Sequence, residues 1–413
     1  MSSTPQPVRG TQSLLGEDAD RFHAVIAAFD RVRRLYGFKR VEVPVIEPTA
    51  VFARTMGETT DVVSKEMYSF DDRSGDSITL RPEFTAGIAR AFLSEGWQQF
   101  APLKVAVHGP AFRYERPQKG RFRQFHQLDA EIIGAAEPQA DVEAISFAAQ
   151  LLDELGLSGR SLLRLNTLGD PDTRQKWRDA LHAHFDKHRN DLSEESRDRL
   201  DRNPLRILDS KAHQDWPIAD SAPGIDDYLT VEAGAFFEAV TKGLDSAGIS
   251  WTREPKLVRG LDYYRHTTFE FVTEELGAQS QLLGGGRYDG LVEALGGSHT
   301  PAVGWAAGIE RLAMMIDAPA VEQLVAVLVP IGEAADDASS RILADLRRAG
   351  IAADCGYRGN MKKRLQRANT AGARFALIIG DSELEAGGAQ VKDLETGEQR
   401  LVLFDKLVEA LRR

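Results

Sequence analysis

The chain has 413 residues, of which 42% are hydrophobic, and this predicts two or three domains with real cores rather than a disordered tail. Its 51 Lys and Arg against 62 Asp and Glu give a net charge of -11, which disfavours a protein that coats nucleic acid through bulk positive charge. The single cysteine, Cys355, cannot form an intrachain disulfide or a multi-cysteine zinc site. With no signal peptide and no apolar run near the ~20 residues of a membrane helix, we expect a cytoplasmic protein without a membrane partner.

Apolar periodicity predicts helices and short strands along the first part of the chain. The helices are expected at residues 22–35 and 142–155, and the strands at residues 41–46, 103–107 and 128–133. Residues 112–125 are rich in arginine and aromatic residues and are broken by Pro117 and Gly120. These breakers predict an exposed basic loop between two strands.

The remaining chain divides into three parts. Residues from about 170 to 245 are polar and predict an inserted helical module, after which strand patterns resume at 256–272 and a mixed segment follows at 300–315. Beyond residue 320 strands and helices alternate, which predicts an α/β domain with a mainly parallel sheet. We therefore expect a first domain over residues 1–320 and a second over residues 321–413.

The positive charge is concentrated locally. Residues 321–413 hold 14 Lys and Arg against 14 Asp and Glu, so the whole excess of -11 belongs to residues 1–320. Within the second domain, residues 341–374 hold nine basic residues against Asp345 and Asp354, a net charge of +7. Such a stretch is either a phosphate-binding footprint or a solvated helix face.

Three separate segments place arginine beside a carboxylate. They are residues 112–115 together with 121–125, residues 259–264, and residues 304–311. An arginine held by strands among apolar neighbours needs an anion, and guanidinium groups bind phosphate and carboxylate bidentately. The alternative interpretation of any one segment is a structural Arg–Glu ion pair.

Together these segments resemble the signatures of class II aminoacyl-tRNA synthetases. Residues 41–52, with Pro44, resemble the first signature, Phe112-Arg-Tyr-Glu115 with Arg121-x-x-x-Phe125 the second, and Gly304-x-x-x-Gly308-x-Glu310-Arg311 the third. More specific similarity to the histidyl-tRNA synthetases is carried by residues 81–87, 115–127, 257–264 and 285–290. The resemblance implies an α+β catalytic domain with a mainly antiparallel six-stranded sheet flanked by helices, a helical insertion and an α/β anticodon-binding domain. It also implies a homodimer.

The resemblance assigns an ATP site to residues of the second and third signatures. It implies that Arg113 binds the α-phosphate and the substrate carboxylate, that Glu115 contacts adenine, and that Phe125 stacks on adenine. Arg121 and Arg311 are implied to hold the γ-phosphate. These roles suit the chemistry, because guanidinium groups bind phosphates and an aromatic face stacks on a base.

The resemblance also assigns a histidine site. It implies that Glu83, Thr85 and Gln127 bind the α-ammonium group, that Glu131 and Tyr264 bind the two imidazole nitrogens, and that Tyr263 lines the pocket. Arg259 is implied to be a fixed positive charge at the α-phosphate, where other class II enzymes often use a metal ion, and with Arg113 it is the expected catalytic pair. Mg²⁺ is expected on the β- and γ-phosphates of ATP, with no tightly bound protein metal. Phe84 is larger than the residue expected at its position, so we expect its side chain to point away from substrate.

The implied activity is ATP-dependent ligation of L-histidine to tRNA(His) through histidyl-adenylate. Gln118 and Arg123 in the basic loop are implied to read the first base pairs, and Lys362, Lys363 and Arg364 to contact the anticodon stem. One alternative is an inactive histidine-sensing regulatory subunit of ATP phosphoribosyltransferase, and another is a class II synthetase for a different amino acid.

Two further patterns have simpler interpretations. The spacing His182-x-His184-x-x-x-His188 suggests a metal site, but it has no neighbouring cysteine and no His-Glu-x-x-His pattern. The run Gly284-Gly-Gly286 lacks the remaining residues of a phosphate loop or a dinucleotide fingerprint, so we expect it to let backbone approach a bound amino acid.

Overall fold

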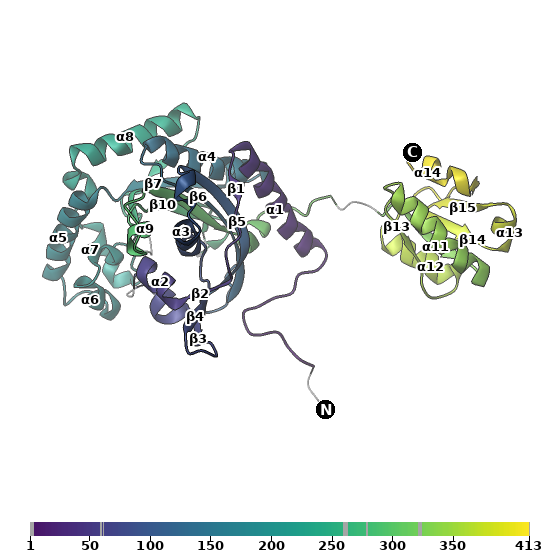
Figure 1. Cartoon of the computed structure of the whole chain (residues 1–413), viewed down its shortest axis with the longest axis horizontal. Helices are drawn as coiled ribbons and strands as arrows, with labels where there is room; N and C mark the ends of the chain where they lie inside the picture. The colour runs from purple at the N-terminus through teal and green to yellow at the C-terminus, as the bar shows by residue number, and fades with distance from the viewer. Residues whose placement is uncertain are drawn as a thin grey trace. The chain divides into compact units, whose positions relative to one another are not determined.

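The computed structural model describes residues 4–57, 60, 62–258, 263–277, 280–320 and 324–412. The chain divides into two compact units, Met1–Pro319 and Ala320–Arg413, which we call the catalytic unit and the C-terminal unit (Figure 1). None of the described helices is both long enough and apolar enough to cross a membrane.

The catalytic unit is built on an eight-stranded sheet with the order β1-β5-β6-β11-β10-β9-β7-β8. Its strands are β1 (Lys39–Arg40), β5 (Leu103–Phe112), β6 (Gln124–Ile133), β7 (Leu162–Thr167), β8 (Thr252–Arg253), β9 (Arg265–Val272), β10 (Gln281–Arg287) and β11 (Ala302–Gly308). The six central strands pair antiparallel, whereas the two-residue strands β1 and β8 pair parallel with their neighbours. The expected mainly antiparallel sheet is confirmed, with two short edge strands added to the expected six.

Helices cover both faces of this sheet. On one face α1 (Glu17–Leu35) and α4 (Pro138–Glu154) pack against the apolar side chains of β6, among them Leu128, Ala130 and Ile132. On the other face lies α3 (Thr85–Ser94), whose buried side chains share a hydrophobic core with residues of β5. The helices expected at 22–35 and 142–155 are α1 and α4, each of which begins earlier.

The strand expected at residues 41–46 is wrong in its bounds. Regular pairing ends with β1, and the chain re-enters a sheet only at β2 (Ile46–Pro48), which pairs with β4 (Ser77–Leu80). Val41 and Val43 are still buried, so the apolar alternation was real. Pro44 has no N–H with which to continue a ladder. A small sheet of order β2-β4-β3, completed by β3 (Tyr68–Asp71), lies beside α2 (Thr49–Met56).

The polar region between β7 and β8 is helical in its described part, as expected. Its helices are α5 (Pro171–Lys187), α6 (Glu194–Leu200), α7 (Trp216–Asp220) and α8 (Val231–Ser246). Asp170 caps α5 by accepting from Thr173 N at 2.8 Å, and Ser193 caps α6. The buried Trp177, Leu181 and Phe185 of α5 give the module an apolar core despite its polar composition.

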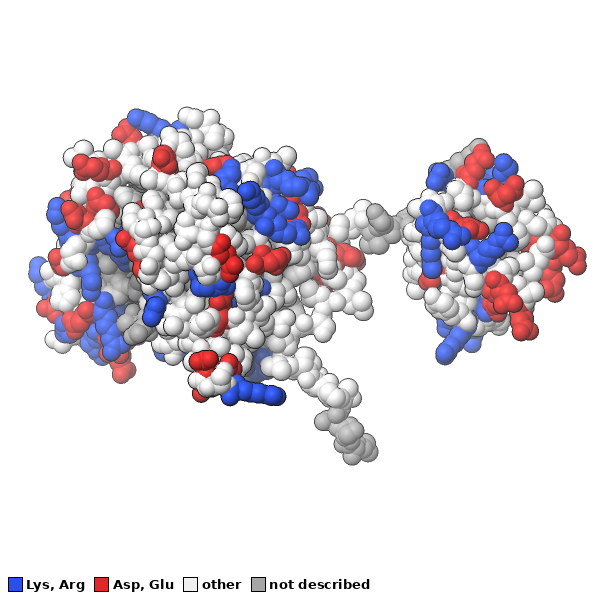
Figure 2. All heavy atoms as spheres, in the orientation of Figure 1, with Lys and Arg blue, Asp and Glu red and all other residues white. Residues whose placement is uncertain are grey.

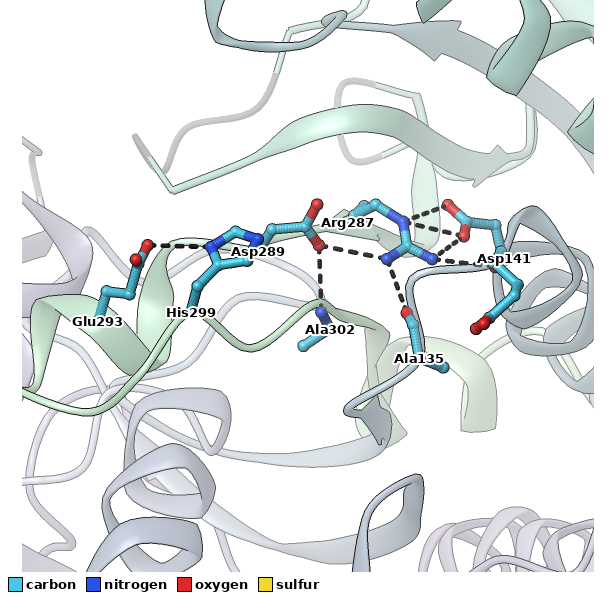
Figure 3. A network of polar contacts seen from close by, with 8 residues as sticks. Ala135, Asp141, Arg287, Asp289, Glu293, His299 and Ala302 are labelled. Carbon is cyan, nitrogen blue, oxygen red and sulfur yellow. Dashed lines mark hydrogen bonds and ion pairs between the residues drawn. The ribbon is translucent and has the colours of Figure 1, made fainter. Parts of the chain in front are cut away.

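A buried ion pair joins β10 to α4 (Figure 3). Arg287 and Asp141 are 1% and 0% exposed, and Arg287 Nε donates to Asp141 Oδ2 at 3.0 Å. Asp289 accepts from both Arg287 Nη1 and the Ala302 amide, at 3.2 and 3.1 Å. Burial alone would lower the pKa of Arg287, but Asp141 and Asp289 raise it overall. Removing one partner would leave an uncompensated buried charge. The network therefore stabilises the position of the end of β10 against α4.

The C-terminal unit is an α/β domain with a mixed sheet of order β13-β12-β14-β15-β16. Its elements are β12 (Ala326–Pro330), α11 (Glu333–Arg348), β13 (Ala353–Cys355), α12 (Met361–Thr370), β14 (Phe375–Ile379), α13 (Asp381–Glu385), β15 (Gly388–Asp393), β16 (Gln399–Leu403) and α14 (Leu407–Leu411). Pairings of β12 with β13 and β14 are parallel, but β14–β15 and β15–β16 are antiparallel. The expectation of a mainly parallel sheet is therefore corrected, because a hairpin beyond residue 379 completes it.

Acidic and basic side chains are intermixed on the face of each unit that Figure 2 shows. The acidic residues behind the net charge of -11 therefore do not form a single acidic patch on that face.

Candidate active site

A cavity of about 380 Å³ opens in the catalytic unit. It brings together most of the residues that the sequence assigned to ATP and histidine: Glu83, Thr85, Arg113, Glu115, Arg121, Phe125, Gln127, Glu131, Tyr263, Tyr264 and Arg311. These residues come from segments spread over more than half of the chain, so the sheet and α3 are what assemble them. Arg259, the other expected catalytic residue, lies outside the described residues.

Strand β6 supplies the base of the cavity through alternate side chains. Gln127, Asp129 and Glu131 line the cavity, while the residues between them point into the core beneath α1 and α4. On the neighbouring strand β11, the partners of these three residues are Gly308, Ala306 and Gly304. The small partners leave space above the sheet, and this explains why the third signature is rich in glycine and alanine.

Glu131 is fixed by two hydroxyl groups. It accepts from Thr85 Oγ1 at 2.6 Å through one oxygen and from Tyr288 through the other. A Cβ at Gly304 would lie 1.4 Å from Glu131 Oε2, so only glycine fits opposite this carboxyl. Burial raises the pKa of Glu131 to about 8; the two hydroxyl donors oppose the shift, and nearby Glu83 adds to it.

Glu83 lies at the N-terminus of α3. Its two carboxylate oxygens each accept a backbone N–H at 2.8 Å, one from Thr85 and one from Ala86. Burial raises the pKa of Glu83, although these hydrogen bonds and Arg113 oppose the shift. Burial also raises the pKa of Asp129 well above its usual range, with Glu131 and Glu83 adding to the effect. We call Glu83, Asp129 and Glu131 the acidic floor.

Phe84 is fully buried in the core between α3 and the sheet and is not part of the cavity lining. The guanidinium carbon of Arg81 lies 4.0 Å from the centre of its ring. A Cβ at Gly109 would approach both side chains, to 2.9 Å from Arg81 Nη2 and 3.3 Å from Phe84. The Phe84 side chain therefore points away from the cavity, as expected, and packs in the core under the segment that carries Glu83 and Thr85.

Three arginines form a second cluster, which we call the arginine wall: Arg113, Arg121 and Arg311. Arg113 Nε donates to Pro82 O at 2.9 Å, and Arg121 Nε lies 2.6 Å from Glu115 Oε2. Burial lowers the pKa of Arg311, and the nearby positive charge of Arg121 lowers it further. Close cations that burial has partly stripped of water favour a polyanion in the space between them.

Phe125 lines the same cavity as the two clusters. The guanidinium carbon of Arg113 is 5.4 Å from its ring centre, in range of a cation–π contact. Phe125, Glu115 and Arg311 all line the cavity, which suits a base stacked on the ring with its phosphates toward the arginines.

Two further residues that had no predicted role, Glu310 and Tyr288, also line the cavity. Glu310 accepts from the His126 amide at 3.0 Å and contacts His126 Nδ1 at 2.8 Å, which ties α10 (Ile309–Ala313) to β6. Tyr288 donates to Glu131. Both residues lie within segments that carry the family resemblance, and this position could have marked them as candidate site residues.

The glycine run on β10 gives room to neighbouring groups. A Cβ at Gly286 would lie 2.8 Å from the ring of Tyr264, and one at Gly285 would lie 2.1 Å from the Gly304 carbonyl oxygen. Gly284 lines the cavity. The run thus admits Tyr264, whose ring centre is 4.6 Å from that of Tyr263.

The basic loop is a tight turn anchored by the N-terminal segment. The Gln118 amide donates to Arg121 O at 3.1 Å, and the reverse bond measures 2.9 Å. Arg123 Nε donates to Glu115 O at 3.2 Å, and the Arg123 amide donates to Gly10 O at 2.8 Å. Neither Gln118 nor Arg123 lines the cavity.

The expected tRNA contacts of the C-terminal unit differ in exposure. Lys362 and Lys363 are exposed in the first turn of α12. Arg364 is mostly covered, because its guanidinium donates to Pro330 O and lies 3.4 Å from Asp336. The two lysines are therefore the accessible cations of this trio.

Two of the three spaced histidines of the inserted module, His182 and His184, have polar partners within the protein. His182 Nε2 lies 3.0 Å from Asp201 Oδ1, and His184 Nε2 lies 3.0 Å from Ile218 O. Within the described part of the chain, no three His, Cys, Asp or Glu side chains are grouped to hold a metal ion.

Comparison with known proteins supports the interpretation of this cavity as the site of a synthetase. The sequence model of the histidyl-tRNA synthetase family matches residues 10–312, and that of an anticodon-binding domain matches residues 325–413. The chain belongs to the histidyl-tRNA synthetase family. A histidine–tRNA ligase of Novosphingobium aromaticivorans is 60% identical over 92% of this chain and 91% of its own length. The corresponding ligase of Gluconacetobacter diazotrophicus is 54% identical over 99% of both chains.

A solved structure shares the complete architecture. The apo histidyl-tRNA synthetase of S. aureus is 35% identical, covers 100% of both chains and superposes with a TM-score of 0.83. The fold of this family, a mainly antiparallel catalytic sheet followed by an α/β anticodon-binding domain, is the fold described above.

Proposed function

We propose that this chain, a histidine–tRNA ligase, works through histidyl-adenylate at the cavity described above. In the first step a carboxylate oxygen of histidine attacks the α-phosphorus of ATP, the bond to the bridging oxygen breaks, and pyrophosphate leaves. In the second step a ribose hydroxyl of the terminal tRNA adenosine attacks the carbonyl carbon, and AMP leaves. The single observation that carries this proposal is one cavity lined by both the acidic floor and the arginine wall.

The arginine wall would bind ATP and stabilise the charge that develops during adenylate formation. Arg113, whose Nε donates to Pro82 O, would contact both the α-phosphate and the histidine carboxylate. Arg121 and Arg311 would hold the γ-phosphate, with Glu115 and Phe125 at adenine. Such fixed cations act by orientation and by electrostatic stabilisation of the transition state. Arg259 is proposed to complete this set.

The polar groups around Glu131 would select histidine. Glu131 and Tyr264 would bind the two imidazole nitrogens, with Tyr263 beside them, and Glu83, Thr85 and Gln127 would surround the α-ammonium group. A site that binds both ring nitrogens rejects isosteric side chains, because its own buried polar groups would lose their partners.

Transfer RNA would meet both units. The basic loop with Gln118 and Arg123 would contact the acceptor end, and Lys362, Lys363 and Arg364 in the matched anticodon-binding domain would contact the anticodon stem. Mg²⁺ would enter on the β- and γ-phosphates of ATP, which supply oxygen ligands that this metal prefers. We further propose that the enzyme is a cytoplasmic homodimer, as the family resemblance implies.

The test is ATP–pyrophosphate exchange with each of the twenty amino acids, using the wild-type protein and Arg259→Ala. We expect exchange with histidine alone, and a loss of at least about 100-fold in the variant, because it removes a charge proposed to contact the α-phosphate. No exchange with histidine would overturn the catalytic proposal. Exchange fully retained in the variant would remove Arg259 from its proposed role while leaving the activity intact.

A further inference from the structure

Asp129 is the one member of the acidic floor whose carboxylate has no hydrogen-bond donor within the described protein. It is 1% exposed, and both of its oxygens lack a partner. By contrast, both oxygens of Glu83 and of Glu131 are bonded to protein groups. A buried carboxylate without donors is costly, so its presence in a cavity indicates a ligand that supplies them.

The neighbours of Asp129 explain why none of the described protein groups donates a hydrogen bond to it. On the two flanking strands its partners are Val107 and Ala306, neither of which has a polar side chain. Two cations lie near it. Arg81 donates hydrogen bonds to the carbonyl oxygens of Val43, Pro44 and Pro110, and Arg113 donates through Nε to Pro82 O. The carboxylate is thus left for whatever occupies the cavity that it lines.

The nearby groups define the chemistry of the missing ligand. Gln127 Oε1, on the same face of β6, is likewise buried without a partner. The amide oxygen accepts only, and so do both oxygens of Asp129 when the carboxyl group is ionised, so a ligand that pairs with the ionised form must donate hydrogens. With Glu83 and Glu131 adjacent, a positively charged donor is favoured over a neutral one.

The distance between Asp129 and Glu131 along β6 indicates which group of the substrate Asp129 contacts. Residues two apart on a strand are separated by about 6.7 Å, so Asp129 lies about half as far from Glu131 as Gln127 does. A histidine molecule whose ring contacts Glu131 reaches this distance with its α-ammonium group, which carries three N–H donors.

We propose that Asp129 is the carboxylate that binds the α-ammonium group of substrate histidine, with Gln127 as a second acceptor. This inference rests on the proposed function for the identity of the ligand. It adds a carboxylate to the ammonium site proposed above, where Glu83 also caps α3 through its two backbone bonds.

Asp129→Asn tests the proposal, because it keeps the shape of the side chain and removes its charge. Calorimetric titration would compare L-histidine with 3-(imidazol-4-yl)propionate, which is the same molecule without its amino group. We expect the variant to bind histidine at least about 10-fold more weakly and the deamino analogue within about 3-fold of wild type, since a charged hydrogen bond is lost only with histidine.

Asp289→Asn is the matched control, because it is the same substitution at a largely buried carboxylate that does not line the cavity. It should leave the ratio of the two affinities unchanged. A ratio unchanged in Asp129→Asn, or an equal loss for both ligands, would overturn the proposal. If the asparagine variant does not fold, Asp129→Ser makes the same comparison with a smaller side chain.

Two measurements separate this inference from the proposed function. Pyrophosphate exchange with histidine by the wild-type protein tests the activity without reference to Asp129. The melting temperature of ligand-free Asp129→Asn tests the alternative of a purely structural aspartate. We expect no decrease, because none of the described residues would lose a hydrogen bond to the carboxylate. A marked decrease would count against a binding role.

Discussion

The acidic floor gathers carboxyl groups and the arginine wall gathers guanidinium groups in one cavity. The two clusters reduce the repulsion between their like charges in different ways. In the floor, burial and mutual repulsion raise the pKa of Glu83, Asp129 and Glu131, so these groups can take up protons when no substrate is bound. Guanidinium groups stay charged, so the wall instead distributes its donors to Pro82 O, Gln281 O and Glu115. One cluster is therefore sensitive to pH, and the other to the presence of anions.

The largest expected effect comes from the wall. Arg113→Lys keeps the positive charge but removes the planar fork that can bind phosphate and carboxylate together. We expect kcat/KM for ATP–pyrophosphate exchange to fall by about 100-fold or more, a loss of about 2.7 kcal/mol of transition-state stabilisation.

The control for this change is Arg160→Lys, which alters an exposed arginine paired with Glu275 away from the cavity. It should leave the exchange rate unaltered. Full activity in Arg113→Lys would mean that charge alone suffices at this position, and the comparison between the two clusters would lose its basis.

A smaller effect is expected from the floor. Glu131→Gln keeps the size of the side chain but weakens its interaction with the imidazole, so the KM for histidine should rise by about 10- to 100-fold. The KM for ATP should stay within about twofold, because ATP is assigned to the wall. Exchange measured while each substrate is varied in turn gives both constants.

Glu143→Gln offers a matched control, because Glu143 lies outside the cavity and pairs with Lys104 at 2.5 Å. An equal rise in both Michaelis constants for Glu131→Gln would show that the floor and the wall do not act as separate binding regions.

The smallest effect concerns stability. Between the ordinary carboxyl pKa of 4.5 and the value of about 8 for Glu131, the folded protein binds more protons than the unfolded chain. Stability from this group is therefore greatest at the acid end of that window and falls as pH rises to about 8. The melting temperature of the ligand-free protein should fall by a few degrees between about pH 6 and pH 9, and Glu131→Gln should reduce that fall. An identical pH profile in the variant would contradict the raised pKa.

The floor was harder to predict from sequence than the wall. Arg113, Arg121 and Arg311 were found because each stands in a recognisable segment beside a carboxylate. Asp129 was missed, because a carboxylate that alternates with Leu128 and Ala130 is typical of an ordinary half-exposed strand. Its significance depends on Val107 and Ala306, which only the strand register places beside it.

The same limit applied to the fold. Helical periodicity located α1 and α4, but it could not show that Arg287 would meet Asp141, 146 residues earlier in the chain. The hairpin of β15 and β16 was also missed, because the alternation of strands and helices through β14 is equally typical of a wholly parallel sheet.

The bond between Gly10 O and the Arg123 amide has a practical consequence. Gly10 has a φ of +87°, and a Cβ there would lie 2.8 Å from Arg123 Cγ and 3.0 Å from Pro117 Cγ. Gly10 is thus a structural support of the basic loop. Trimming of the first ten residues to improve crystals would remove this bond and alter a loop that we propose to contact the acceptor end. A shortened protein should therefore keep Gly10.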